Sequence, residues 1–474
     1  MDLFESRAGS VVLKSYMVAK RSEEKARQSA ANERLAIYHD DWKDILEAIL
    51  ASQFHPTNYK KIRLLKNTTQ NILKKVIDDV AIVYKISPVR DYGKSDIMDE
   101  IYGYLNIDEF MTRVDQYGTL LNDALIRVGW DTELKRITLD LNTPANTSVI
   151  QRDNYPEQAA AVYYDFEYVD DQFKGEKLKV FWSDFEHFLF KESEDKDGLL
   201  RIDTRIPAED NPDMINPYGK LPFIILHMRQ IPSIFWNPTG GSDLVEGTTS
   251  VGFKRTLKDY LFKNQSFKQL WLRAQNTDGI ADDMLSDPLS MFKLNGETAQ
   301  VGLLDMTAAF AELDATLQSD INAFLSTYGL SIDMFATSGE EASGKALNIK
   351  NRGLREIREK QLPKFRRVEG ELFDMIRLVY NTYNPVGIPK TLEFKIDFAE
   401  LETYIEPMQR RLQAKWDLDN GLISPAQFFM LFNPDIVDEK DAEERIIENA
   451  AKVKELQGKG FNLGKYFDES NPDA

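Results

Sequence analysis

The chain has 474 residues, of which 42% are hydrophobic and 11% aromatic. This is longer than one hydrophobic core usually supports, so about two or three lobes are expected. No cysteine is present, which excludes disulfide bonds, thiolate metal ligands and a thiol nucleophile. The formal net charge of −18 argues against a protein that grips nucleic acid through clustered lysine and arginine.

The beginning of the chain and its apolar stretches bear on membrane association. Residues Met1 to Glu5 lack a basic region followed by an apolar run, which a secretory signal would require. The longest apolar stretch, Leu221 to Leu226, contains Pro222 and is far too short to span a bilayer. A soluble protein of the cytoplasm with no membrane partner is therefore expected.

Helical periodicity dominates the first third of the chain. Leucine, isoleucine and valine recur every three or four residues, with alanine and charged residues between them, as in amphipathic helices. The second helix should stop before Pro88, because a residue that precedes proline avoids the helical conformation. The predicted helices are Ser15–Leu50, Asn67–Tyr84 and Ile107–Arg127.

The period changes to two between Asp131 and Leu226. Aromatic and β-branched residues gather there in short runs that aspartate, glycine and asparagine separate, which is typical of strands and turns. Helices followed by strands indicate a lobe of the α+β class. The predicted strands include Leu134–Leu141, Ala161–Val169, Leu178–Trp182 and Phe185–Phe190.

Further along, two predicted helices, Asp243–Phe267 and Met306–Tyr328, bracket a small strand-rich insertion. Turns in the insertion are expected at Asp278-Gly279 and Asn295-Gly296. No internal repeat or low-complexity tract interrupts the chain.

A long helix is predicted from Ser343 to Tyr383, and Pro363 should kink or divide it. Residues after Gly458 are expected to fray. The remaining predicted elements are a strand at Leu392–Phe398 and helices at Glu406–Asn420, Pro425–Leu431 and Asp441–Leu456.

The segment from Gly339 to Lys345 nearly matches a phosphate-binding loop. The match fails at the next position, because Ala346 replaces the serine or threonine that would hold magnesium. The apolar run that ends at Asp305 lies upstream, whereas the magnesium-binding strand should follow the loop. A nucleotide-dependent enzyme therefore stays as an alternative that the sequence disfavours.

Metal-binding patterns are weak. The four histidines lack the spacing of a zinc helix. Asp184 and Glu186 flank His187, but on a strand both would face away from it. Carboxylate pairs such as Asp170-Asp171 are interpreted as turn residues. No metal, cofactor or catalytic residue is expected, so the chain is not predicted to be an enzyme.

Positive charge gathers in one place. Nine lysines and arginines but only two glutamates lie between Lys345 and Arg367, a net +7 (9 − 2) inside an acidic chain. One interpretation is a solvated helix with i,i+4 pairs, Arg352 with Glu356 and Arg355 with Glu359. The other is contact with a polyanion or an acidic neighbouring subunit, and both stay open. The residues considered for such contact are Lys345, Lys350, Arg352, Arg355 and Arg358.

Several local phrases are spread along the chain, and they begin at Asn67, Gly118, Gly129, Pro217, Gly241, Ser343, Gly421, Asn433 and Glu443. Taken in this order, they resemble the portal proteins of tailed phages that infect Gram-positive hosts. The resemblance covers roughly residues 30 to 455. It also explains Ser343-Gly-Lys-Ala-Leu347 as the start of the family's long helix, with Ser343 as an N-cap.

The resemblance implies the portal architecture, assembled as a ring of about twelve subunits around a channel for double-stranded DNA. An acidic chain suits such a conduit, because phosphate contacts would add affinity and hence friction. The implied parts are a wing (1–240), a stem helix (241–267), a clip (268–304), a second stem helix (305–330), a tunnel loop (331–342), a long kinked helix with a wing strand (343–399), a crown (400–457) and a flexible tail (458–474).

Two groups of residues receive roles from the resemblance alone. The tunnel-loop residues implied to face DNA are Asp333, Met334, Phe335, Ala336, Thr337, Ser338 and Gly339. The clip residues implied to dock the packaging motor and the adaptor are Asp278, Gly279, Asp282, Asp283, Asn295 and Gly296.

The implied partners are other copies of the chain, double-stranded DNA, the terminase large subunit, a head-completion or tail adaptor protein, and the major capsid and scaffolding proteins. The implied location is the portal vertex of the virion, after assembly in the host cytoplasm. Besides the enzyme, the second alternative is a virion adaptor that is not a portal and binds protein through the basic helix.

Overall fold

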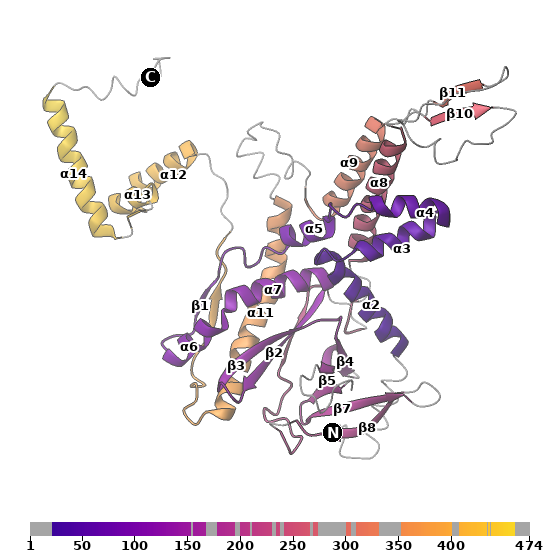
Figure 1. Cartoon of the computed structure of the whole chain (residues 1–474). Coiled ribbons are helices and arrows are strands. Elements are labelled where there is room, and N and C mark those ends of the chain that lie inside the picture. The colour runs from indigo at the N-terminus through magenta and orange to yellow at the C-terminus, as the bar shows by residue number, and fades with distance from the viewer. Residues whose placement is uncertain are drawn as a thin grey trace. The chain divides into compact units, whose positions relative to one another are not determined.

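The computed structural model describes residues 21–152, 155–166, 178–194, 200–208, 211–229, 234–237, 241–265, 269–273, 300–304, 310–330, 352–400, 407–433, 435–436 and 438–459. The chain divides into two compact units (Figure 1). The first unit comprises Met1–Ser338 and Asn351–Leu401, and the second comprises Gly339–Lys350 and Glu402–Ala474. Helices and antiparallel sheets occur together in the first unit, which confirms the α+β class.

The first unit begins with helices that are shorter than the sequence predicted. The single helix expected up to Leu50 is two helices, because Asp40 takes a left-handed conformation (φ 63°) between them. The helix predicted from Asn67 starts at Ile72 instead, where the side chain of Asn71 accepts the N–H of Lys74 at 3.0 Å. These elements are α2 (Arg21–Tyr38), α3 (Lys43–Gln53), α4 (Pro56–Ile62), η1 (Arg63–Leu65) and α5 (Ile72–Val80).

Helices α6 (Asp96–Leu105) and α7 (Ile107–Leu121) follow. The predicted extension of the third helix to Arg127 is wrong. Asn122 adopts a left-handed conformation (φ 68°) that ends α7, and asparagine tolerates this conformation better than most residues. The residues that follow form a strand with partners on both sides.

That strand, β2 (Asp123–Asp131), is the centre of a three-stranded antiparallel sheet of order β3-β2-β9. Its neighbours are β3 (Arg136–Asn142) and β9 (Phe223–His227). The long helix α11 (Arg352–Tyr383) packs on all three strands. The largest hydrophobic core lies there and includes Ile126, Leu226, Phe365, Phe373 and Ile376. Pro363 lies inside α11 without dividing it.

A second antiparallel sheet has five strands in sequence order. Two irregularities in the β4–β5 pairing occur next to Gln151. A separate core between the two sheets includes Leu125 and Phe223 from one sheet and Val162 and Trp182 from the other. The strands are β4 (Thr147–Arg152), β5 (Tyr155–Phe166), β6 (Leu178–Ser183), β7 (His187–Glu194) and β8 (Leu200–Ile206).

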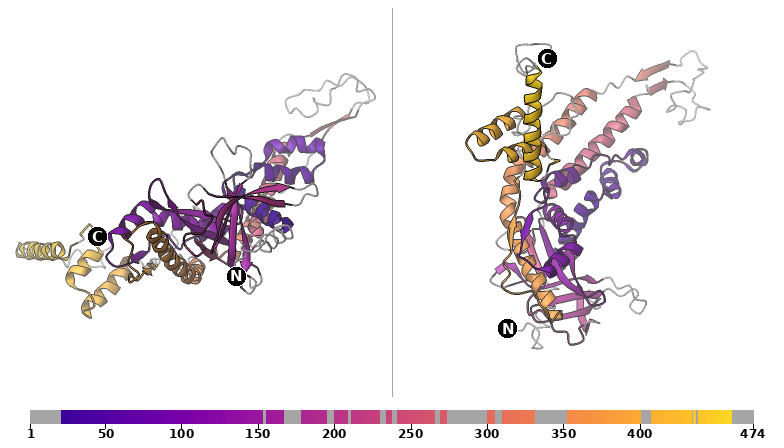
Figure 2. Two further views of the ribbon diagram at one scale, coloured as in Figure 1. Left: turned by 90° about the horizontal axis from the view of Figure 1, so that it is seen from below. Right: turned by 90° about the vertical axis from the view of Figure 1, so that its left-hand side faces the viewer.

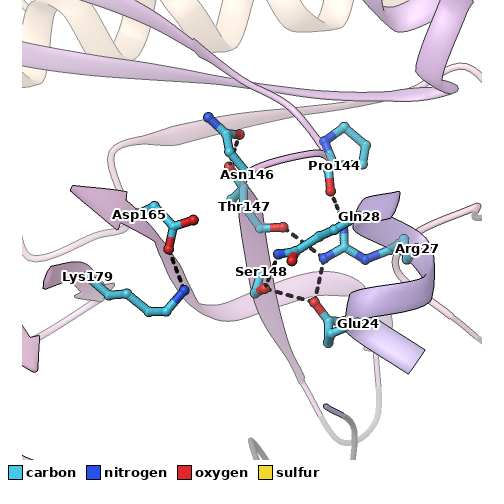
Figure 3. A network of polar contacts seen from close by, with 9 residues as sticks. All are labelled: Glu24, Arg27, Gln28, Pro144, Asn146, Thr147, Ser148, Asp165 and Lys179. Atoms are coloured by element: carbon cyan, nitrogen blue, oxygen red, sulfur yellow. Dashed lines mark hydrogen bonds and ion pairs between the residues drawn. The ribbon is translucent and has the colours of Figure 1, made fainter. Parts of the chain in front are cut away.

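A polar network ties α2 to this second sheet (Figure 3). The guanidinium of Arg27 donates to the carbonyl oxygens of Pro144 and Thr147, the latter at 3.0 Å, and pairs with Glu24. The hydroxyl of Ser148 donates to Glu24 at 2.8 Å. Arg27 is only 6% exposed, so its charge is satisfied inside the unit.

The other elements of the first unit are a short ribbon and a helical pair. Strand β1 (Val89–Asp91) pairs antiparallel with β12 (Lys395–Asp397), so the expected strand near the C-terminus joins the N-terminal elements. The helical pair and its strands are α8 (Ser242–Gln265), β10 (Gln269–Arg273), β11 (Gln300–Leu304) and α9 (Phe310–Thr327).

The described part of the second unit contains only helices: α12 (Pro407–Asp419), α13 (Pro425–Leu431) and α14 (Glu439–Gly458). Ser424 caps α13 reciprocally with Gln427, as a capping box should. None of the described helices in either unit is long and apolar enough to cross a membrane.

Candidate functional site

Helices α8 and α9 pack side by side and lead into the β10–β11 ribbon (Figure 2). Lys254 pairs with Asp320 at 2.5 Å and Lys258 pairs with Asp314, so two ion pairs link α8 to α9. A Cβ atom at Gly247 would lie 2.6 Å from the ring of Phe324. Glycine is therefore what allows this close approach of the two helices.

The ribbon that joins the pair is antiparallel, from Gln269 opposite Leu304 to Arg273 opposite Gln300. The two strands together with the helices form a two-helix rod (residues 242–265 and 310–327) that ends in a ribbon. The sequence predicted both helices and a strand-rich insertion between them, and the two helices and a strand at each end of the insertion are confirmed.

Helix α9 contains no lysine or arginine, and its acidic residues are Glu312, Asp314 and Asp320. Two of the three pair with α8. The exposed surface of α9 consists largely of small or uncharged residues, among them Ala315, Gln318, Ser319, Asn322 and Ser326. Such a surface offers no cation to a phosphate group.

Many of the residues singled out from the sequence lie outside the described residues. These are the tunnel-loop residues Asp333 to Gly339, the clip residues at 278–296, and two basic residues, Lys345 and Lys350. The near-match to a phosphate loop, Gly339 to Lys345, lies outside them as well.

The described part of the basic helix places much of its charge inside the chain. Arg358 is only 4% exposed, and its guanidinium donates to the carbonyl oxygens of Ala399 at 2.9 Å and Val83 at 3.4 Å. Lys364 donates to the carbonyl oxygen of Met228. The expectation that Arg358 contacts DNA or another subunit is therefore wrong, because its side chain is already bonded in the interior.

Arg367 behaves similarly at the edge of the three-stranded sheet. It donates to the carbonyl oxygen of Ile225 at 2.9 Å and pairs with Glu371 at 2.8 Å. Lys360 and Arg366 are exposed on the same helix. Within the described part of the positive run, Lys364 and Arg367 therefore hold α11 against the β9 edge of the sheet, and Arg358 holds it to the segments at Val83 and Ala399.

The only histidine considered as a metal ligand, His187, is held by aromatic packing. Its ring stacks on Trp182 at 3.6 Å between centroids, and Asn211 lies 3.2 Å from its Nδ1. Burial and nearby Arg127 lower its pKa to about 4, so it stays neutral at neutral pH. Asp184 and Glu186 pair with arginines elsewhere.

A second histidine contact was not predicted. His227 Nδ1 lies 2.7 Å from Asp123, which is 1% exposed and also accepts the N–H of Asn237 at 2.8 Å. The other ring nitrogen lies 3.4 Å from the carbonyl oxygen of Glu157. No local signal could find this pair, because 104 residues separate its members. Neither contact involves a hydroxyl, so the pair links strands and does not resemble a nucleophile with its base.

Two hollows of about 370 and 480 Å³ lie along β9. They share Gln158, Phe223 and Ile225. The charged residues that line them include Arg152, paired with Asp184 at 2.7 Å, and Arg367, paired with Glu371. Within the part of the chain that the structure describes, no cluster of three metal-binding side chains occurs. We assign no cofactor to either hollow.

A buried carboxyl group adjoins Arg358. Asp115 is 1% exposed and accepts the N–H of Val83 at 2.9 Å. Burial raises the pKa of Asp115 to about 7, although the hydrogen bond from Val83 and the charge of Arg358 oppose the shift. The group therefore binds a proton in the folded state at a pH where the unfolded chain has released it.

We expect the free energy of unfolding of Asp115→Asn to increase, relative to that of the wild type, as the pH rises from 4 to 8. The folded pKa lies above the unfolded value, so the stabilisation of the wild type is complete below about pH 4 and is lost through about pH 7. The relative change should be on the order of a few kcal/mol. Chemical denaturation of both proteins across this range measures it. A constant difference between the two proteins would contradict the assignment.

No protein-family model matches the chain, and no curated protein matches it. Three similar solved structures come from gene transfer agent (GTA) particles. The neck of an empty GTA particle computed with C6 symmetry shares 10% identity at a TM-score of 0.42, over 78% of this chain and 91% of that chain. A chain from the virion of a native GTA particle shares 10% identity at a TM-score of 0.42, over 79% of this chain and 92% of that chain. A chain from the neck of a native GTA particle computed with C12 symmetry shares 10% identity at a TM-score of 0.42, over 80% of this chain and 94% of that chain.

Proposed function

We propose that the chain is a portal-type subunit of a virion, which assembles into a ring and lets double-stranded DNA pass through the centre. The observation that carries the proposal is the two-helix rod with its terminal ribbon, placed between an N-terminal α+β lobe and the long helix α11. This is the order of stem, clip and long helix that the resemblance implies.

The charge of α9 supports a passage for DNA better than a tight binding site, and Lys254 and Lys258 of α8 are paired with the aspartates of α9. A helix without lysine or arginine adds no phosphate contact, and each such contact would strengthen binding and slow sliding. Three cations of the basic run of α11, Arg358, Lys364 and Arg367, add little to phosphate binding, because they bond to the chain itself. The separate motor would supply the energy for movement.

An enzymatic role finds little support among the described residues. His227 and Asp123 contact backbone and each other, and the hollows along β9 are lined by paired charges. The proposal therefore requires no ATP hydrolysis by this chain, with or without magnesium. Docking of the terminase large subunit and of an adaptor at residues 268–304 is part of the proposal.

Negative-stain electron microscopy of the purified chain tests the proposal. Closed rings of about twelve subunits with a central hole are expected. Monomers at high protein concentration would overturn it. Neither the wild type nor Lys345→Ala should hydrolyse ATP, and both should form rings. If the wild type hydrolyses ATP with magnesium and Lys345→Ala does not, a nucleotide-dependent enzyme is favoured instead.

Deleting Met334 to Ser338 should leave ring assembly intact and impair DNA packaging or retention. The proposal places these residues in the channel, so their loss would remove contacts with DNA and none between subunits. Packaged DNA in particles assembled with the variant is the measurement. Unchanged packaging and retention would contradict the tunnel-loop role.

A further inference from the structure

The helices of the second unit leave most of their large apolar side chains exposed. The buried core of their described residues is small and consists of Ala426, Ile436 and Ala442, with Phe429 and Met430 partly buried against it. The burial of these two alanines and one isoleucine contributes little to the free energy of folding, compared with a full hydrophobic core. The exposed apolar residues are Leu412, Trp416, Leu422, Leu431, Ile447, Val453 and Leu456.

On α12, two rows of exposed side chains run next to each other. Leu412 and Trp416, 61% and 60% exposed, lie one turn apart and form an apolar row. Arg411 and Lys415 form a parallel basic row, one residue earlier in each case. Residues four apart stand on the same side of a helix, so the four make one continuous face. We call it the α12 face.

On α14, the arrangement is the complement. Ile447, 69% exposed, and Ala451 form an apolar row, and Glu444 and Glu448 form an acidic row beside it. All four side chains are exposed, and we call them the α14 face. The acidic row follows the apolar row in the direction of helix rotation, whereas on α12 the basic row precedes it. When two such helices run parallel with their apolar rows in contact, the basic and acidic rows therefore lie on the same side.

The apolar rows of both faces are not covered by the helices of their own unit. Among the charged residues, Arg411 lies over the ring of Phe432 at 5.7 Å, and Glu448 pairs along α14 with Lys452 at 2.7 Å. Helices α12 and α14 each pack on α13, and both faces remain exposed. Two different, complementary surfaces on one chain produce a head-to-tail contact between copies, and repeated contacts of this kind close into a ring when the rotation allows. Opposite charges beside an apolar strip select the partner and the orientation.

We propose that the α12 face of one copy packs in parallel against the α14 face of a neighbouring copy. This inference rests on the proposed function, since it names one of the surfaces through which a ring would form. The occupant is a second copy of this chain, because the chain itself carries the charge and the apolar row that each face lacks.

The absence of cysteine makes a crosslinking experiment clean. Gln413→Cys lies beside the α12 face, and Ala451→Cys lies in the α14 face. The two full-length single-cysteine variants are assembled together and treated with a short bis-maleimide. A covalent dimer of the mixture is expected, and neither variant alone should give one, because the contact joins unlike faces.

A matched control uses Asn449→Cys, which is exposed on the opposite side of α14, in place of Ala451→Cys. Its mixture with Gln413→Cys should crosslink much less. Equal crosslinking of the control, dimers within a single-variant preparation, or assembled rings without any crosslink would each overturn the proposed surface and leave the proposed function standing. A chain that stays monomeric would instead refute the proposed function, and this inference with it.

Charge reversal gives an independent readout. Lys415→Glu and Glu444→Lys should each weaken self-association by roughly threefold per contact, as for an exposed ion pair. The double variant should recover most of the loss, because the exchanged charges again face each other. Sedimentation at several protein concentrations measures the effect. Additive losses in the double variant would exclude a direct contact between the two rows.

Discussion

Replacing Glu369 with alanine is expected to lower the free energy of unfolding by about 3 to 5 kcal/mol. Glu369 lies on α11 with no exposed surface, and its two carboxylate oxygens accept Arg90 Nη2 at 2.7 Å and Arg90 Nε at 3.0 Å. The hydroxyl of Tyr84 donates to the same carboxylate at 2.9 Å. Removing it leaves a guanidinium with 7% exposure that keeps only Asp108 as an ionic partner.

The cost arises from the unpaired buried charge and not from the value of the ion pair itself. A double variant, Arg90→Met with Glu369→Leu, should therefore recover most of the lost stability. The exposed pair of Lys452 and Glu448, with side chains 64% and 63% exposed, provides the control, and Lys452→Ala should change the free energy by less than about 0.5 kcal/mol. Denaturant unfolding followed by tryptophan fluorescence measures all three. A loss below about 1 kcal/mol for Glu369→Ala would contradict the account.

Trp42→Ala is the second substitution expected to have a large effect, also about 3 to 5 kcal/mol. The side chain of Trp42 has no exposed surface and belongs to the core that joins α3 and α5 to the base of the two-helix rod. Its loss leaves a cavity that the surrounding helices can fill only partly. The exposed Leu64, 79% accessible, is the control, and Leu64→Ala should change stability by about 0.5 kcal/mol or less.

The partner of Trp42 gives a sharper form of the same test. A Cβ atom at Gly252 on α8 would lie 2.8 Å from the indole and 3.2 Å from the carbonyl oxygen of Asn67. Gly252→Ala should therefore cost about 1 to 3 kcal/mol through overpacking. Adding Trp42→Phe should make the double variant more stable than the sum of the single effects predicts. Strict additivity would show that the two residues do not share this contact.

Local patterns predicted most elements of the first unit but misplaced several of their ends. The alternation and helical periodicity of the sequence indicated strands β5, β6 and β7 of the five-stranded sheet, the two helices of the rod and the long helix α11, all of which occur. Strands β4 and β8 of that sheet were not predicted. The end of α7 was misplaced because Leu125 continues the helical spacing of Val114, Tyr117 and Leu121. The left-handed Asn122 and the strand partners on both sides of β2 determine that boundary. One of these partners, β9, lies about 100 residues further along the chain.

For the candidate functional site too, some features follow from the sequence alone and others only from the tertiary structure. Residue types alone determined the absence of a magnesium ligand after Lys345 and the lack of cysteine. Short-range periodicity alone determined the two-helix rod that brackets a ribbon. Only the tertiary structure decided what the basic residues of α11 do. Arg358 and Lys364 meet carbonyl oxygens more than 40 and 130 residues away, and whether a cation faces solvent or a buried carbonyl depends on packing, which local charge patterns do not encode.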